Sequence, residues 1–378
     1  MDFEISSKKD AFEFFERQIS RAYYKLYESQ KLEFESYLLK SFILEKELDV
    51  NLDEADVLRQ LLSFEFKGET VFPTLRKIED DFWEVFYPVL SVRMYLEKLD
   101  GRFFAFHTLS ESKKVDLIVQ KLVSQHHQID AMWLWHQFLD RQLWLNQRSF
   151  KGFSFDYDFR KISGDESDQT LSYLKMQIWG GGHEIVELYK KLRNMLRNKA
   201  TLAKVRFKEF GDNPEHFVLT DIKFLGKFRS HGTDVRLHRK ILFDVKTAYA
   251  QKLATIEKKY RLSWQIDGQR EAVLEGEPLY FKFSKRIDYL DRLIEVVFNG
   301  SYPFRLLGFV RETNHGYFIR VVDLHVGSRF NLELYPDLMV VYLPEDVCGN
   351  TVIRFYTNLQ HTMETEVVVE DAQGEKVF

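Results

Sequence analysis

The stretch HGTDVRLHRKILFDVKTAY, residues 231–249, decides how the middle of this chain folds. Its apolar residues follow one another at steps of three and four, and the stripe continues to residue 260. The stripe consists of Val235, Leu237, Ile241, Leu242, Val245, Ala248, Tyr249, Leu253, Ile256 and Tyr260. No Gly or Pro interrupts it, and Thr233 or Asp234, behind Gly232, suits an N-cap. This spacing predicts one amphipathic helix over 235–260.

The same stretch resembles two families of enzymes, a nuclease family when it is taken as strands and a phosphodiesterase family through one short box. Asp234, Asp244 and Lys246 resemble the metal-binding pattern of PD-(D/E)xK nucleases, which needs Asp-x-Lys on one face of a strand. In a helix that pair points about 200° apart. His238, Lys240 and Asp244 resemble the phospholipase D-like box, but the spacing is one residue short and no Gly-Ser-x-Asn follows. Neither resemblance exceeds ten residues, and the helix prediction weighs against both.

Composition sets the broad class of the protein. The 378 residues suffice for two or three domains, and 45% hydrophobic and 15% aromatic content indicates a globular chain. A net charge of −4 does not indicate a nucleic-acid coat, although a local basic patch is compatible with it. With Cys348 as the single cysteine, no internal disulfide forms. The charged N-terminus and the lack of a long apolar run predict a cytoplasmic protein without a membrane span.

Hydrophobic patterning divides the chain near residue 150. Apolar positions at helical spacing over 9–48, 53–64, 73–98 and 111–146 predict an all-helical domain of residues 1–150. The polar stretch 152–169 is the expected boundary. Beyond it, alternating apolar runs and two further amphipathic segments predict a mixed α/β domain with a central sheet over residues 151–378.

Two basic or glycine-rich segments suggest a weak anion site. Gly180, Gly181 and Gly182 lie between a predicted strand and a predicted helix, where free backbone amides hold anions. Lys227, Arg229 and His231 form a predicted basic loop before the long helix. The two segments are expected to bind one anion jointly. The alternative is that each is an ordinary capping turn.

Histidines and the lone cysteine suggest further chemistry. Asp323 and His325 share one face of a predicted strand, so with Cys348 they would form a nucleophilic or metal-binding set. A structural hydrogen bond and a buried apolar thiol are the alternatives. His361 would be an additional ligand. His126, His127 and His136 of the aromatic-rich stretch 124–137 lack zinc-motif spacing, so we interpret that stretch as a packing helix.

No complete catalytic set emerges from these patterns, and no cofactor is predicted. The sequence therefore favours a non-catalytic subunit or adaptor of an intracellular complex, which binds partner proteins or itself through aromatic-rich helices. One alternative is a metal-dependent nuclease or phosphodiesterase acting on nucleic acid. Another is a nucleotide- or anion-sensing module. A place in a bacterial defence operon would suit such a chain, although no residue points to it.

Overall fold

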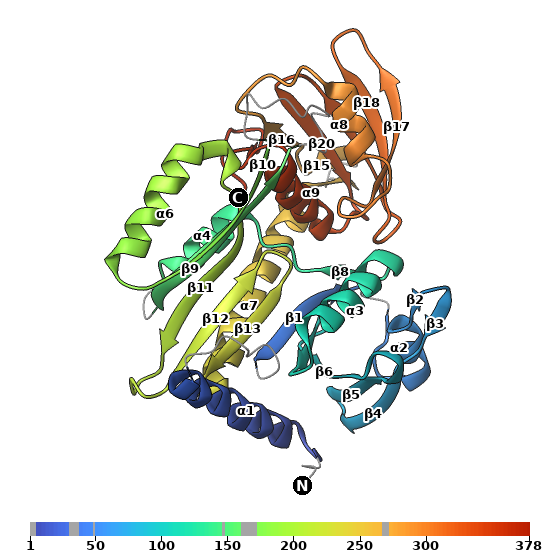
Figure 1. Ribbon diagram of the computed structural model, residues 1–378. Helices are drawn as coiled ribbons and strands as arrows, with labels where there is room; N and C mark the ends of the chain where they lie inside the picture. Colours follow the sequence, from blue (N-terminus) through green and yellow to red (C-terminus); the bar gives the residue numbers. More distant parts are fainter. Residues whose placement is uncertain (1–4, 30–37, 48–49, 146–147, 160–171, 267–271) are drawn as a thin grey trace.

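The computed structural model describes residues 5–29, 38–47, 50–145, 148–159, 172–266 and 272–378. Within these residues the chain is mostly β-sheet, and the helices are scattered along it (Figure 1). The prediction of an all-helical N-terminal region followed by a central-sheet α/β domain is therefore wrong. None of the helices in the described ranges has both the length and the apolar character needed to cross a bilayer.

The strands of the described residues run through the whole chain. They are β1 Leu39–Lys46, β2 Phe64–Phe66, β3 Glu69–Val71, β4 Thr74–Glu79, β5 Phe82–Tyr87, β6 Val92–Lys98, β7 Phe103–Thr108, β8 Ile129–Ala131, β9 Arg148–Asp158, β10 Tyr173–Trp179, β11 Leu202–Phe210, β12 Phe217–Lys223, β13 Lys227–Gly232, β14 Arg261–Ile266, β15 Ala272–Glu275, β16 Leu279–Lys282, β17 Leu306–Glu312, β18 Tyr317–Asp323, β19 Arg329–Leu334, β20 Leu338–Pro344 and β21 Val368–Glu370.

The α-helices connect these strands. They are α1 Lys8–Ser29, α2 Ala55–Leu61, α3 Ser112–Gln125, α4 His136–Leu143, α6 His183–Leu196, α7 Val235–Lys259, α8 Leu290–Val297 and α9 Gly349–Thr362, with short 3₁₀ turns η2 Pro88–Leu90 and η3 Arg197–Lys199.

Two large sheets form the body of the molecule. The first has 11 strands in the order β10-β9-β11-β12-β13-β1-β7-β6-β5-β4, with β8 also paired to β1. The predicted domain boundary near residue 150 would fall inside this sheet. The second has eight strands, β15-β14-β20-β19-β18-β17 with β16 and β21, and β14 pairs with β20 in parallel. Helix α9 lies between the two sheets (Figure 1).

The predicted long helix is confirmed as α7. It runs from Val235 to Lys259, and most of its apolar stripe is buried, whereas Leu237 is half-buried and Ala248 is exposed. Asp234 is the N-cap, and its side chain accepts a hydrogen bond from the amide of Arg236 at 2.8 Å. The predicted helix 183–196 is likewise confirmed as α6, and the alternating runs in the C-terminal third are strands β17 to β20.

The N-terminal prediction failed because several of its strands are buried on both faces. All eight residues of β1 and all six of β7 are buried. β1 buries Lys40, Ser41, Glu45 and Lys46 together with its apolar residues, so it shows no alternation between an apolar and a polar face. Without that alternation, the aromatic residues of this region match helical spacing by chance. Helices α1, α2, α3 and α4 do occur in this region, but β4 to β6 replace the helix predicted over 73–98.

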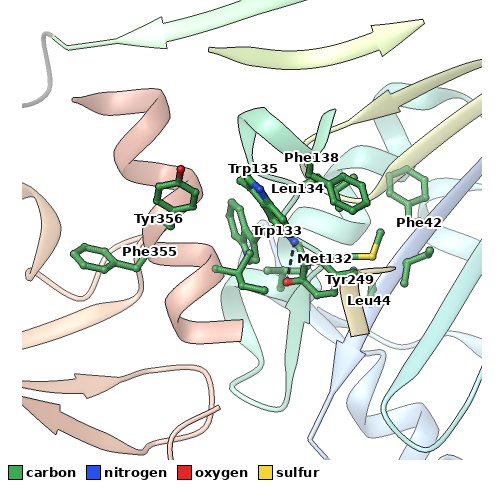
Figure 2. Close-up of a cluster of buried hydrophobic side chains, with 14 of the residues drawn as sticks. Phe42, Leu44, Met132, Trp133, Leu134, Trp135, Phe138, Tyr249, Phe355 and Tyr356 are labelled. Carbon is green, nitrogen blue, oxygen red and sulfur yellow. Dashed lines mark hydrogen bonds between the residues drawn. The ribbon is translucent and has the colours of Figure 1, made fainter. Parts of the chain in front are cut away.

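The aromatic-rich stretch near residue 133 forms the centre of the core instead of a packing helix. Trp133 and Trp135 follow β8 in extended conformation and are 0% and 2% exposed. Figure 2 shows them between Phe355 and Tyr356 of α9 on one side and Phe42 of β1 on the other. These aromatic side chains were expected to bind a partner protein. Most of them are instead buried within the chain itself.

A chain of buried polar groups crosses the first sheet beneath α1 and α7. Ser41 Oγ lies 2.8 Å from His107 Nδ1 and 2.8 Å from His238 Nε2. His107 Nε2 contacts Glu97 at 2.9 Å, and His238 Nδ1 contacts Ser230 Oγ at 2.8 Å. All five side chains are at most 1% exposed, so these contacts satisfy groups that have no access to water.

This polar chain makes stability depend on pH in a defined direction. Burial lowers the pKa of His238 from 6.5 to about 3. The unfolded chain therefore binds a proton below pH 6.5 that the folded chain does not bind until about pH 3. The contribution of His238 to stability is complete above pH 6.5 and falls by about 1.4 kcal/mol per pH unit below it. Urea unfolding at pH 7, 6 and 5 measures this loss. Equal unfolding free energies at the three pH values would contradict it.

Candidate metal centre

The structure does not bring the predicted nuclease residues together. Asp234 caps α7, Asp244 lies 3.9 Å from Lys240, and Lys246 pairs with Asp100 at 2.5 Å. His238 faces the buried polar chain beneath the helix, whereas Lys240 pairs with Glu209. The side chains of Asp244 and Lys246 thus lie on different sides of α7, as expected for two residues that are two positions apart in a helix.

The residues of the predicted anion site lie on one sheet but not at one point. Gly180–Gly182 connect β10 to α6, as predicted, and Gly182 has a φ of +80°. The basic segment is strand β13 and not a loop: Lys227 pairs with Asp116 and Arg229 with Asp221. Burial lowers the pKa of His231 to about 4. Strand β13 is four positions from β10, roughly 19 Å across the sheet, so a joint site stays a prediction.

His325 and Cys348 do come together, with Glu45 as the third member. One ligand atom of each residue, a carboxylate oxygen, an imidazole nitrogen and the thiol sulfur, lies within 4.8 Å of the others. The Cys348 sulfur is 3.4 Å from Glu45 Oε1. Asp323, the acid expected here, faces away into an ion pair with Arg354. The predicted Cys-His-Asp set is therefore a Cys-His-Glu set, which we call the three-residue centre.

Three separate elements position the three-residue centre. Glu45 is on β1, in the first sheet. His325 lies in the turn between β18 and β19, where Gly327 has a φ of +73°. Cys348 is the N-cap of α9, directly after β20. The centre thus lies where the first sheet meets the second sheet and the start of α9.

A buried ion pair network holds His325 and α9 in place. Arg354 of α9 is fully buried and pairs with both Asp130 and Asp323. Asp323 also accepts hydrogen bonds from the Thr351 hydroxyl and, at 2.9 Å, from the backbone amide of His325. The carboxylate of Asp323 is therefore a positioning group: it fixes the turn that presents His325 relative to the helix that presents Cys348.

Arg102 and Glu257 balance charge beside the centre. Arg102 donates to Glu45 Oε1 at 2.5 Å and lies 3.1 Å from the Cys348 sulfur. Glu257 accepts two hydrogen bonds from the same guanidinium, at 2.8 and 3.0 Å. Burial by itself lowers the pKa of Arg102, but Glu45 and Glu257 hold it above its usual value. Burial raises the pKa of Glu45 and of Cys348.

Unpartnered polar atoms gather in the cleft at this centre. Glu45 Oε2, His325 Nδ1 and Ser328 Oγ are buried and have no hydrogen-bond partner among the described residues. All three residues are at most 5% exposed, and all three line a cleft of about 430 Å³ together with Arg102 and Cys348. Leaving such groups unpartnered costs about 1–3 kcal/mol each, so their clustering points to a bound species.

The donor set suits a divalent cation of the zinc class. Thiolate, imidazole and carboxylate are the three ligand types that zinc takes in proteins. Ligand atoms around a tetrahedral zinc lie about 3.3–3.7 Å apart, so the side chains need to close by about 1 Å. Arg102 pairs with Glu45, and Glu257 pairs with both Arg102 and Arg261, so a divalent cation would chiefly compensate the negative charge of a Cys348 thiolate.

Residue chemistry points to two members of the centre and not to the third. The pattern that groups Asp323, His325 and Cys348 rests on a histidine and the lone cysteine only 23 residues apart. Glu45 lies 280 residues before His325, inside a stretch that is expected to be helical. His361, the other predicted ligand, is elsewhere: its Nδ1 donates to the carbonyl of Asp156 at 2.7 Å.

Comparison with known proteins places the whole chain in one group. A family described as MJECL33-like protein matches residues 1–378. The uncharacterized protein MJECL33 of Methanocaldococcus jannaschii is 26% identical over 416 residues, which covers 99% of this chain and 96% of that protein. No solved structure matches the chain.

Proposed function

The chain belongs to the MJECL33-like protein family, and for this member we propose a function as a metal-dependent hydrolase whose zinc-class cation is held by Glu45, His325 and Cys348. The observation that supports the proposal most strongly is the cluster of unpartnered buried atoms on Glu45, His325 and Ser328 in one cleft. Structural zinc sites use four protein ligands, whereas catalytic sites use three and leave one position open. The centre has three.

The chemistry follows from that open position. A zinc-class cation there would act as a Lewis acid on a water or a polar substrate group. The protein's own residues fix the geometry: Asp323 holds the turn of His325, and Arg102 orients the Glu45 carboxylate. The cleft of about 430 Å³ sets the size of the substrate, and its charged rim with Arg261 and Asp346 favours a small polar molecule.

Metal content tests the proposal directly. The purified chain, loaded with zinc and dialysed, is expected to retain about one zinc per chain in elemental analysis by mass spectrometry. Cys348→Ser, His325→Ala and Glu45→Gln are each expected to lower zinc affinity at least about 100-fold, because even outer partners of metal ligands are worth 10–100-fold. Hydrolysis of a chromogenic ester by the loaded protein should be lost with a chelator.

His183→Ala is the matched control, because His183 is 81% exposed on α6 and should leave zinc content unchanged. Melting temperatures show whether each variant is folded. Wild-type protein that retains no zinc, or folded Cys348→Ser that retains as much as wild type, would overturn the proposal.

The adaptor function stays a prediction without support from the described surface of the aromatic segment. Trp133, Trp135 and Phe138, on which it depended, are at most 5% exposed. Trp144 and Leu145, each 46% exposed, are the large apolar side chains of that segment that reach the surface.

A further inference from the structure

A second cavity, of about 430 Å³, lies on the other side of β1 and has aromatic walls. Phe224 and Tyr302 line it with partly exposed rings, and the buried rings of Phe42 and Trp133 lie behind them. The ring centroids of Trp133 lie 6.2 Å from Tyr302 and 6.3 Å from Phe224. Ligand sites of this size with apolar walls and a few polar groups are the usual form of a small-molecule pocket. Walls of this kind suit a flat ring, because aromatic faces pack on it.

Cations gather along one edge of this cavity. Lys223 of β12 and Lys227 of β13 line it, and Lys204 of β11 is the next strand neighbour of Lys223. Lys204, Lys223 and Lys227 are direct cross-strand partners, so their side chains share one face of the sheet. Like charges placed opposite one another destabilise a sheet, and a bound anion would remove that cost.

Carboxylates pair with some of these lysines and not with others. Asp116 pairs with Lys227 at 2.5 Å, whereas Lys204 Nζ bonds the neutral side chain of Gln177 at 2.8 Å. Burial, together with neighbouring cations, lowers the pKa of Lys204 to about 8, although Asp221 opposes this shift. Of the two lysines that line the cavity, Lys227 is therefore paired, whereas the Lys223 ammonium forms no ion pair with a described residue.

Carboxylates lie at another part of the same cavity. Asp156 and Asp158 of β9 line it and supply acceptors, next to the Asn358 amide of α9. A base with exocyclic amino groups would donate to such acceptors. The cavity thus combines ring-stacking walls, acceptors and a cationic edge.

We propose that this cavity binds a nucleotide, with its base against the aromatic walls and its phosphate at Lys223, next to Lys227. Neither the metal centre nor its proposed function enters this inference. The cavity and the metal-centre cleft share no lining residue among those described. Cys348→Ser is therefore expected to leave nucleotide binding intact, and the two proposals fail independently.

Isothermal titration of the full chain with adenosine monophosphate, adenosine and inorganic phosphate tests the proposal. The monophosphate is expected to bind at least 10-fold more tightly than adenosine, and this advantage should shrink with salt. Lys223→Ala should reduce monophosphate affinity to that of adenosine without changing adenosine affinity. Guanosine and cytidine monophosphates show which base is preferred.

Val119→Trp tests the cavity itself, because Val119 is 8% exposed and lines it, so an indole there fills the base position. The variant is expected to abolish binding of both ligands. If Val119→Trp fails to fold, Phe224→Ala is used instead, because it removes one aromatic wall of the cavity. Lys190→Ala on α6 is the charge-matched control and should bind like wild type.

Three results would overturn the proposal. The first is no binding of any nucleoside monophosphate up to millimolar concentration. The second is equal affinity for the monophosphate and inorganic phosphate, which would indicate an anion site without a base site. The third is that the protein binds a single-stranded oligonucleotide but does not bind mononucleotides, which would indicate a nucleic-acid surface.

Discussion

Replacing Arg354 by Met is expected to lower the free energy of unfolding by about 3–5 kcal/mol, a large effect for a single substitution. Arg354 is fully buried in the centre of α9 and pairs with Asp130 of β8 and Asp323 of β18. Its removal leaves two buried carboxylates without their main counter-charge. The network also joins the two sheets, so the loss is felt across the whole molecule.

Urea unfolding of wild type and Arg354→Met measures this difference. Arg292→Met is the control, because Arg292 is 43% exposed and pairs with an exposed Glu295, an arrangement worth little. Adding Asp130→Asn and Asp323→Asn to Arg354→Met should restore part of the stability, since no charge is then left unpaired. A loss below about 1 kcal/mol in the single variant would contradict the network's role.

Replacing Trp133 by Ala is expected to cost about 3–5 kcal/mol of unfolding free energy. Trp133 is 0% exposed, and its indole nitrogen donates to Asp130 Oδ1 at 3.0 Å. Its backbone amide also donates to the Tyr249 hydroxyl at 3.3 Å, the bond drawn in Figure 2. The substitution therefore opens a cavity at the centre of the core and removes one donor from a buried carboxylate.

Trp264→Ala is the matched control for Trp133→Ala, because Trp264 is 72% exposed on β14. Chemical denaturation should separate the two variants by several kcal/mol. Equal, small losses in both would show that the segment after β8 does not form the core as described.

Sequence patterns predicted well those elements that show a contrast between two faces. α7 and α6 have an apolar stripe on one side, and β18 and β19 alternate between buried and partly exposed residues. Contrast of this kind is what periodicity detects. The long helix was therefore predictable from residues 231–260 alone, and with it the failure of the Asp-x-Lys pair to converge.

Elements without such contrast were missed. β1 and β7 are buried on both faces, so nothing in their own residues separates a strand from a buried helix. α9 lacks contrast for the opposite reason: all of its residues are buried, including the polar Asn350, Arg354 and Gln360, so its sequence has no purely apolar face. Its burial depends on partners such as Asp130, which are distant in the sequence.

The metal centre was half predictable for the same reason. Residue chemistry groups His325 with Cys348, and the structure brings them together. The identity of the acid was not predictable, because Glu45 reaches the centre only through the pairing of β1 within a sheet that was not expected. Asp323 is close in sequence, but Arg354 and Thr351 engage its oxygens.

Strand β1 lies between the two proposed sites. Phe42 lines the aromatic cavity, and Glu45 belongs to the metal centre. Phe42 and Glu45 are three positions apart, so their side chains point to opposite faces of β1. This arrangement keeps their substitutions separable, because a change at Glu45 does not touch the aromatic walls.

The absorption spectrum of the cobalt-loaded protein tests the proposed metal centre most directly. Cys348 is the single cysteine of the chain, so any thiolate-to-cobalt charge-transfer band in the near ultraviolet originates from it. We predict such a band at one cobalt per chain, its loss in Cys348→Ser, and its displacement by zinc. A cobalt-treated, folded wild-type protein without that band, or a band that survives Cys348→Ser, would contradict the assignment of Cys348 as a ligand.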